Sequence, residues 1–262
     1  MKLAIVGAGK MGGAVLTGAL RAGVLDAADV GIYHPDVERR EALAAAHGVA
    51  ALDDDGVHRA ERVLLGVKPQ AFERVAPLVA RRGGCYVSIM AGVPADAIAR
   101  RVGSRRVIRA MPNLGARARV SSTALASLSD ATEADVAFAQ ALFEAVGRVH
   151  PIPEARFDAF TGLAGSGPAY AALVAEALAD GGVRAGFRRD QAQELAREVL
   201  RAAAALLEED GPAGLKDEVA SAGGTAIAGV RELERHGTRF ALMEAVEAAT
   251  ARARALSGGD ET

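Results

Sequence analysis

A glycine-rich turn near the start of the chain constrains the fold most. The apolar segment Leu3-Ala4-Ile5-Val6 runs directly into Gly7-Ala8-Gly9-Lys10-Met11-Gly12, which has G-x-G-x-x-G spacing and opens an alanine-rich helical pattern. In such a turn the first glycine permits a tight reversal, the second lets the backbone approach a pyrophosphate, and the third lets helix pack on strand. The segment therefore predicts a buried strand and a dinucleotide-phosphate loop at a helix N-terminus. A glycine turn without a ligand is the alternative.

Short apolar runs alternate with helical patterns up to residue 152. Such alternation predicts an α/β fold, a doubly wound and mostly parallel sheet of the Rossmann type. The predicted strands after the first are 30–33, 62–67, 85–90 and 106–110, with 123–128 and 147–152 as late additions, and the predicted helices are 37–47, 71–82, 95–102 and 133–145. Pro151 and Pro153 mark the expected end of this domain, which we place at 1–153.

The remaining residues, 154–262, read as a second domain that is all helical. Long alanine- and leucine-rich patterns cover 168–179, 190–208, 225–235 and 238–256, and we expect the first to end at Gly181-Gly182 and the second to begin with an Asp190 cap. Small residues such as Ala172, Ala175 and Ala179 permit close helix contact. That contact is explained as well by packing within the chain as by a dimer.

The composition excludes several classes of partner and location. A formal net charge of -2 argues against a nucleic-acid or anionic-membrane partner. No apolar run reaches the roughly 18 residues of a membrane-spanning helix, and the first strand begins too early to leave room for a signal peptide. Cys85, the single cysteine, lies in an apolar strand pattern and is predicted to be buried rather than reactive. We expect a cytoplasmic protein.

The residues after the second predicted strand bear on the choice of cofactor. Enzymes that use NAD place an acidic residue at the end of this strand to hold the ribose 2′-hydroxyl. Here Tyr33-His34-Pro35 stands there, and Asp36, one step beyond, is expected to cap the next helix. Arg39 and Arg40 follow within reach of a 2′-phosphate. The pattern favours NADP(H), with NAD(H) as the alternative, and His34 either contacts the phosphate or lies in a solvated loop.

A second glycine turn, Ser221-Ala222-Gly223-Gly224-Thr225, opens another predicted helix. Free N–H groups at a helix start bind anions, and a small carboxylate suits them. An ordinary interhelical turn explains the same residues equally well.

The charged run Asp53-Asp54-Asp55, with His58 nearby, lacks the spacing of known metal motifs. We predict a solvated loop there and no metal site. No paired spacing of histidine, cysteine and carboxylate marks a catalytic nucleophile either.

Further motifs support a family resemblance. They are Gly66-Val67-Lys68-Pro69-Gln70, Ser88-Ile89-Met90-Ala91-Gly92-Val93, Arg109-Ala110-Met111-Pro112-Asn113, Thr161-Gly162-Leu163-Ala164-Gly165-Ser166-Gly167-Pro168-Ala169-Tyr170 and Leu215-Lys216-Asp217-Glu218-Val219. With these motifs, in this order and in both predicted domains, the chain resembles the pyrroline-5-carboxylate reductase family over nearly its whole length.

The resemblance implies NADPH-dependent reduction of 1-pyrroline-5-carboxylate to L-proline by hydride transfer to the imine carbon. It also implies a helical domain that interlocks with a second copy to form a homodimer, which in some members assembles further. The candidate cofactor-binding residues are Val6, Gly7, Ala8, Gly9, Lys10, Met11, Gly12, His34, Arg39, Gly66, Val67, Lys68, Pro69, Ala91, Gly92 and Val93. The candidate substrate-binding residues are Ser221, Gly223, Gly224, Thr225 and Glu154, and the candidate catalytic residues are Thr225 and Ser221.

Three positions depart from the family pattern. Ala222 replaces a usual proline, Ala226 replaces a second threonine thought to donate a hydrogen bond at the imine nitrogen, and Leu114-Gly115 replaces Thr-Pro. The loop that follows carries Arg117 and Arg119. These changes leave two alternatives open, a reductase for a different and more acidic cyclic imine, or a non-catalytic NADP(H)-binding protein.

A β-hydroxyacid dehydrogenase, which shares the same general plan, is disfavoured. That class relies on a lysine in the first long helix of its second domain to donate a proton to the developing alkoxide. No lysine occurs between Glu154 and Leu215.

Overall fold

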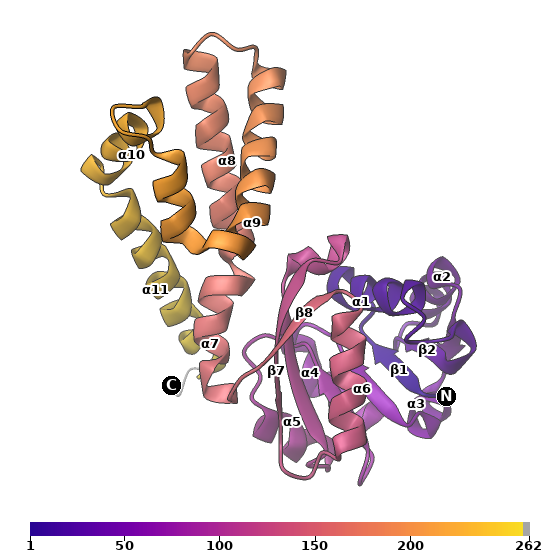
Figure 1. The fold of residues 1–262 in the computed structure, drawn as a ribbon. Helices are drawn as coiled ribbons and strands as arrows, with labels where there is room; N and C mark the ends of the chain where they lie inside the picture. Colours follow the sequence, from indigo (N-terminus) through magenta and orange to yellow (C-terminus); the bar gives the residue numbers. More distant parts are fainter. Residues whose placement is uncertain (259–262) are drawn as a thin grey trace. The chain divides into compact units, whose positions relative to one another are not determined.

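A computed structural model describes residues 1–258, apart from the side chain of Asp210. It contains two compact units (Figure 1). The first comprises Met1–Gly165 together with the chain from Ala249 onward, and the second comprises Ser166–Ala248.

The first unit is built on one eight-stranded sheet with the order β3-β2-β1-β4-β5-β6-β7-β8. All pairings are parallel except β6 with β7, so the predicted mostly parallel sheet is confirmed. The strands are β1 (Leu3–Val6), β2 (Val30–Tyr33), β3 (Ala50–Leu52), β4 (Arg62–Leu65), β5 (Cys85–Ser88), β6 (Val107–Pro112), β7 (Ser121–Ser127) and β8 (Gly147–Pro151). The order of the first six strands is that of dinucleotide-binding sheets.

Helices cover both faces of this sheet. Along β1, Leu3 and Ile5 pack toward one face, while Ala4 and Val6 pack toward the other, as the two-residue period of a strand dictates. The helices of this unit are α1 (Lys10–Arg21), α2 (Val37–His47), α3 (Asp54–Arg59), α4 (Pro69–Val79), α5 (Ala95–Val102), α6 (Glu133–Glu144) and α7 (Phe157–Phe160), with 3-10 turns η1 (Ala27–Asp29), η2 (Leu114–Ala118) and η3 (Glu154–Arg156) and a π-helical turn η4 (Thr161–Gly165). Residues of α1 and α6 share one core, and residues of α3, α4 and α5 share the other.

The predicted solvated loop at residues 53–55 is wrong, because these residues start a short helix. The carboxylate of Asp53 caps α3 by accepting a hydrogen bond from the Gly56 N–H at 2.7 Å. The Tyr33 hydroxyl donates to Asp54 at 2.6 Å. The acidic run therefore shapes the end of β2 and the start of α3.

The second unit is helical, as predicted. Its helices are α8 (Gly167–Arg184), α9 (Arg189–Val219), α10 (Thr225–Arg235) and the first part of α11 (Thr238–Ser257). Gly181-Gly182 does not end α8: a Cβ on Gly182 would lie 3.1 Å from the Ala192 Cβ, so this glycine serves the contact between α8 and α9. Asp190 lies inside the first turn of α9, not at its cap, and Gly211 kinks that helix.

No helix in the described part of the chain combines the length and apolar character needed to cross a bilayer.

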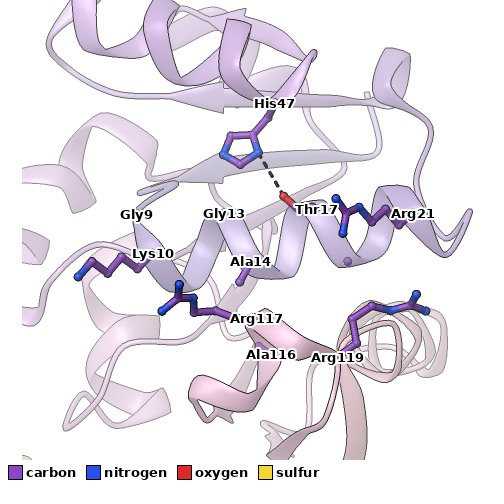
Figure 2. Close-up of a pocket in the computed structure, with 11 residues that line it drawn as sticks. Gly9, Lys10, Gly13, Ala14, Thr17, Arg21, His47, Ala116, Arg117 and Arg119 are labelled. Carbon is purple, nitrogen blue, oxygen red and sulfur yellow. Dashed lines mark hydrogen bonds between the residues drawn. The ribbon is translucent and has the colours of Figure 1, made fainter. Parts of the chain in front are cut away.

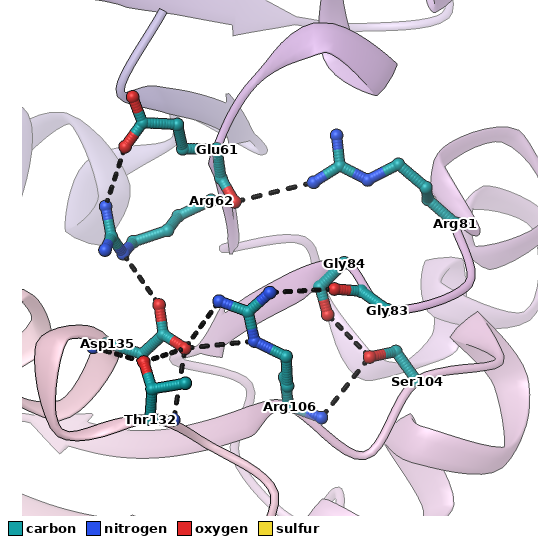
Figure 3. Close-up of polar contacts among 9 residues, drawn as sticks. All are labelled: Glu61, Arg62, Arg81, Gly83, Gly84, Ser104, Arg106, Thr132 and Asp135. Carbon is teal, nitrogen blue, oxygen red and sulfur yellow. Dashed lines mark hydrogen bonds and ion pairs between the residues drawn. The ribbon is translucent and has the colours of Figure 1, made fainter.

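A polar network lies at the edge of the first unit's core (Figure 3). The fully buried carboxylate of Asp135 accepts hydrogen bonds from Arg62 Nε at 3.1 Å and from Arg106 Nη2 at 2.7 Å. Asp135 also completes a capping box with Thr132 at the start of α6. One carboxylate thus joins β4, the residue before β6 and the start of α6, and its neutralisation by two guanidinium groups explains how it tolerates burial.

Candidate functional site

The first glycine turn brings two backbone segments into direct contact. Gly7 has φ 98°, and a Cβ there would lie 2.5 Å from the carbonyl carbon of Gly66, in the turn after β4. A Cβ on Gly12 would lie 2.6 Å from the Gly7 oxygen. Only glycine permits this approach, and it places the turns after β1 and β4, both predicted to bind cofactor, side by side.

Gly9, in contrast, faces open space. A Cβ at this position would meet no atom within 4 Å. Gly9 is the N-cap of α1, and neither a side-chain cap nor an acidic residue in the first turn occupies the N–H groups there. The free donors and the helix dipole fit a phosphate group, so these residues match the pyrophosphate of a dinucleotide.

The end of β2 carries the residues predicted to distinguish the two nicotinamide cofactors. Asp36 caps α2 by accepting a hydrogen bond from the Arg39 N–H at 3.0 Å, as predicted. Its backbone N–H donates to His34 Nδ1 at 3.0 Å. Because the Asp36 carboxylate is occupied as a cap and Arg39 is exposed, the local charge suits a 2′-phosphate better than a 2′-hydroxyl.

A cavity of about 170 Å³ lies at the carboxyl ends of β4, β5 and β6, where ligands bind in open α/β sheets. It contains Pro69, Ala91 and Gly92, three of the predicted cofactor-binding residues. The remaining lining residues are Gln70, Arg109, Met111, Phe157, Asp158, Thr161, Ala253, Leu256 and Ser257. The cavity therefore connects two predicted cofactor segments with residues that the sequence analysis did not assign to a site.

Arg109 stood in a motif of the sequence analysis, but it was not predicted to be a site residue. Its side chain is 8% exposed, its guanidinium lies 4.8 Å from the centre of the Phe157 ring, and Nη1 donates to Glu154 Oε1 at 2.7 Å. The same Glu154 oxygen accepts from the Ala95 N–H at 2.7 Å. A charged residue in the middle of the predicted strand 106–110 was the signal that could have found it.

Glu154 is thus held by two groups of the first unit. Ala95 begins α5, directly after the segment Ala91-Gly92-Val93. The carboxylate therefore links this segment to Arg109 on β6. No feature of this geometry tests a contact with substrate, so that role stays a prediction.

The second glycine turn has the geometry of an anion site. Gly223 has φ 70°, which favours glycine, and a Cβ on Gly224 would lie 2.3 Å from the Ser221 hydroxyl oxygen, so a side chain there would displace this hydroxyl. Gly224 is the N-cap of α10 and has no side-chain cap. The Ser221 hydroxyl and the free N–H groups from Thr225 onward therefore converge at an exposed helix start.

The predicted residues fall into two groups. The glycine turn, the segments 66–69 and 91–93, His34, Arg39 and Glu154 belong to the first unit, and Ser221, Gly223, Gly224 and Thr225 belong to the second. Among residues 1–258, no group of three or more histidine, cysteine, aspartate and glutamate side chains could hold a metal ion. The sheet order, the open helix N-terminus and the cavity at the strand ends define the class of Rossmann-type dinucleotide-binding proteins.

Comparison with known proteins identifies the family. Residues 154–256 match the model for pyrroline-5-carboxylate reductase dimerisation, and residues 2–92 match the model for coenzyme F420-dependent NADP oxidoreductases. The chain is 51% identical to a pyrroline-5-carboxylate reductase of Thermus thermophilus, over 98% of both chains, and 41% identical to one of Pisum sativum, over 97% of this chain and 96% of the other. The chain belongs to the pyrroline-5-carboxylate reductase family.

Solved structures agree in fold. A 1-pyrroline-5-carboxylate reductase from Streptococcus pyogenes superposes with a TM-score of 0.87 at 32% identity, over 97% of this chain and 98% of the other. A pyrroline carboxylate reductase from Plasmodium falciparum, solved with NADP bound, gives a TM-score of 0.86 at 24% identity over 98% of both chains.

Proposed function

We propose that the chain reduces 1-pyrroline-5-carboxylate to L-proline by hydride transfer from NADPH to the imine carbon. The observation that carries the proposal is the 51% identity to a pyrroline-5-carboxylate reductase over 98% of both chains. Two helix N-termini have glycine at the N-cap and therefore no side-chain cap, at Gly9 and at Gly224. The first suits the phosphates of the cofactor and the second the carboxylate of the substrate.

The first unit would hold the cofactor, which supplies the hydride when bound. The N–H groups at the start of α1 would take the pyrophosphate, and His34 with Arg39 would take the 2′-phosphate, so that NADP(H) is preferred over NAD(H). The turns at 66–69 and 91–93 would contact the remainder, with Glu154 fixing the second turn through Ala95 and Arg109.

The second unit would bind the substrate. The carboxylate would lie on Ser221 and on the N–H groups of Gly223 and Thr225, whereas the Gly224 N–H, also predicted to take part, already donates to the Ser221 backbone oxygen at 3.0 Å. Thr225 or Ser221 would donate a hydrogen bond near the imine nitrogen. That hydrogen bond is to the neutral imine nitrogen; once the nitrogen is protonated, its N–H donates to the hydroxyl oxygen instead. A protonated imine is already electrophilic, so orientation and exclusion of water supply much of the rate without an acid–base pair.

A homodimer formed through residues 154–262 is part of the same proposal. The match of residues 154–256 to a dimerisation model supports it, as do large apolar side chains left exposed in the second unit, such as Leu173 and Phe240 at 66% each. The groove between α8 and α9, lined by Ala172, Leu173 and Ala175 among others, would receive the second copy. A higher oligomer of dimers and a cytoplasmic location also remain predictions.

The test is NADPH oxidation at 340 nm by the purified protein offered 1-pyrroline-5-carboxylate, with NADH in parallel and proline measured as the product. Turnover with NADPH in preference to NADH is expected. The variant Ala226→Thr restores the side chain usual in the family, and its comparison with the unchanged protein measures what that hydroxyl adds. Tight NADPH binding without proline formation would refute the proposed reaction.

A second candidate is a cyclic-imine reductase with a more acidic substrate. It is favoured by Ala226, by Leu114-Gly115 and by the loop that follows Gly115, which carries Arg117 and Arg119. Assays with ring imines that carry a second carboxylate would separate this activity from proline formation. Cofactor binding with no turnover of any imine would instead indicate the non-catalytic alternative.

A further inference from the structure

A basic hollow of about 350 Å³ lies along the first helix, bounded by α1, the end of α2 and η2 (Figure 2). Five of its lining residues are basic, and none carries a carboxylate. The lining residues are Gly9, Lys10, Gly13, Ala14, Thr17, Gly18, Arg21, His47, Ala116, Arg117 and Arg119. This accumulation stands out in a chain whose formal net charge is -2.

The cations in this hollow are not neutralised by the protein. Among residues 1–258, Lys10, Arg21 and Arg117 make no ion pair and no side-chain hydrogen bond, whereas many other arginines are paired, including Arg62, Arg106 and Arg109. Unpaired like charges held close together repel one another. A bound anion would relieve that repulsion.

The loop that presents the arginines is rigidly built. The Asn113 side chain accepts from the Gly115 N–H at 3.0 Å and donates to the Ala164 oxygen at 2.8 Å. The Val120 N–H donates to the Gly115 oxygen at 3.0 Å, and a Cβ on Gly115 would lie 2.6 Å from the Val120 oxygen. The backbone positions of Arg117 and Arg119 are therefore fixed before any ligand arrives.

Arg119 shows backbone strain within this loop. In the described part of the chain it is the one non-glycine residue with positive φ, at 62°. Its Nε donates to the Ala145 oxygen at 3.2 Å, which anchors the guanidinium at the rim of the hollow. An arginine kept where glycine is favoured points to a role for its side chain, because such strain persists mainly at functional positions.

The charges are spread along α1. Figure 2 shows Lys10 and Arg117 near the N-terminal end of the helix, and Arg21 and Arg119 toward the other end. His47 lies over Gly13 and Thr17, with its Nδ1 3.4 Å from the Thr17 hydroxyl. A ligand with negative charge along its length fits this distribution better than a single small ion does.

We propose that this hollow is a second anion site, which adjoins the predicted cofactor loop at Gly9 and Lys10 and binds a linear chain of phosphate groups such as an inorganic polyphosphate or the triphosphate of a nucleotide. Arg117 and Arg119 provide charge-assisted hydrogen bonds, and Lys10 and Arg21 add charge at the two ends. The proposal concerns this surface of the first unit and is independent of which imine the protein reduces.

The experiment is calorimetric titration of the full-length protein with tripolyphosphate, at low ionic strength, with and without saturating NADPH. ATP without magnesium, orthophosphate and citrate are titrated in parallel. Tripolyphosphate is expected to bind in the presence of NADPH, at least tenfold tighter than orthophosphate or citrate. ATP binding as tightly as tripolyphosphate would identify the nucleotide source of the phosphate chain, and weaker ATP binding would identify the inorganic one.

Two variants and a control complete the test. Arg117→Leu and Arg119→Gly are each expected to weaken tripolyphosphate binding about tenfold, as expected for loss of a charge-assisted hydrogen bond. Arg119→Gly places glycine at a position with positive φ, so the thermal midpoint of this variant should stay close to that of the unchanged protein. A loss of tripolyphosphate binding in this variant would therefore not be caused by unfolding. Arg100→Leu removes an exposed charge on α5, outside the hollow, and should change binding less than twofold. The proposal would be overturned if tripolyphosphate did not bind, if NADPH displaced it, or if all variants bound it as tightly as the unchanged protein.

Discussion

Arg106 Nη2 lies 2.7 Å from Asp135 Oδ2, so that the residue before β6 is tied to the first turn of α6 by a buried carboxylate. Arg62 approaches the other oxygen of the same carboxylate at 3.1 Å (Figure 3). Burial of Asp135 opposes its ionisation, but hydrogen bonds from Arg106 and Thr132 outweigh burial and lower its pKa to about 2.

This low pKa predicts how stability responds to acid. Because the pKa of Asp135 is about 2 in the folded protein and near 4 when unfolded, the unfolded state binds the proton first as the pH falls. The ionised Asp135 carboxylate therefore contributes about 2 kcal/mol to the free energy of unfolding. This contribution is complete above about pH 5 and is lost as the pH falls from about 5 to about 2. Urea unfolding at pH 7, 4 and 3 measures it. Asp135→Asn should abolish this part of the pH dependence, and a profile unchanged in that variant would contradict the assignment.

Removing the charge should also lower stability at neutral pH. Asp135→Asn leaves Arg62 and Arg106 without their buried carboxylate and weakens the capping box of α6. The expected loss is about 3 kcal/mol in the free energy of unfolding at pH 7. Asp130→Asn, at an aspartate with a largely exposed side chain, is the matched control and should change stability by less than about 0.5 kcal/mol.

The single cysteine is predicted to be inert in the folded protein. Cys85 is buried on β5, and burial, followed by the nearby charge of Asp135, raises its thiol pKa to about 12. The thiolate required for reaction is therefore scarce at any ordinary pH. A maleimide should label Cys85 only in denaturant, as intact mass measures. Rapid labelling of the native protein at pH 8 would show that β5 opens easily.

Two glycines of the first turn should respond differently to an added methyl group. Gly9→Ala places a Cβ in open space, so the protein should fold with a stability loss of about 1 kcal/mol at most, while NADPH affinity falls at least tenfold. Gly12→Ala forces a Cβ to within 2.6 Å of the Gly7 oxygen and should lower stability by about 2 kcal/mol or more. Thermal unfolding and NADPH fluorescence titration distinguish the two. Unchanged NADPH affinity in Gly9→Ala would argue against phosphate binding at this turn.

Glu154 should act on the cofactor through the turn that it supports. Glu154→Ala removes the acceptor for the Ala95 N–H and leaves Arg109 buried without a carboxylate, so we expect about a tenfold rise in the KM for NADPH. Glu154→Gln keeps an acceptor oxygen and should recover part of the loss. If Glu154 instead bound the substrate directly, the KM for the imine would rise and that for NADPH would not.

Much of the first unit could be predicted because its signals are local. The glycine turn, the apolar runs of β1 and β2 and the Asp36 cap are each specified by adjacent residues, and the structure confirms them. The short helix at Asp54–Arg59 was not predicted, because a run of charged residues is typical of a loop. The side-chain cap at Asp53, which starts this helix, is evident only in the structure. The continuation of α8 through Gly181-Gly182 depends on Ala192, a contact with another helix that no local pattern encodes.

The candidate site also contains parts that the sequence predicts and parts that only the fold reveals. The turns at Gly7 and at Gly223 were predicted from the sequence alone. Both glycines have positive φ, a conformation that favours glycine, so the residue type itself indicates the turn. Arg109 and its partners Glu154 and Ala95 are distant along the chain, and only the folded sheet brings them together. Whether Ser221 and Thr225 contact the substrate is still a prediction.

The last helix returns to the first unit. From Ala249 the chain belongs to that unit again, and Ala253, Leu256 and Ser257 line the cavity at the strand ends. A Cβ on Gly92 would lie 3.0 Å from the Leu256 oxygen, and the Ser257 hydroxyl donates to Asp158 at 2.8 Å. Truncation before Ala249 would therefore not yield an intact nucleotide-binding module: it would also remove one wall of the cavity. A separable module must keep residues 249–257, joined to Gly165 by a linker in place of the helical unit.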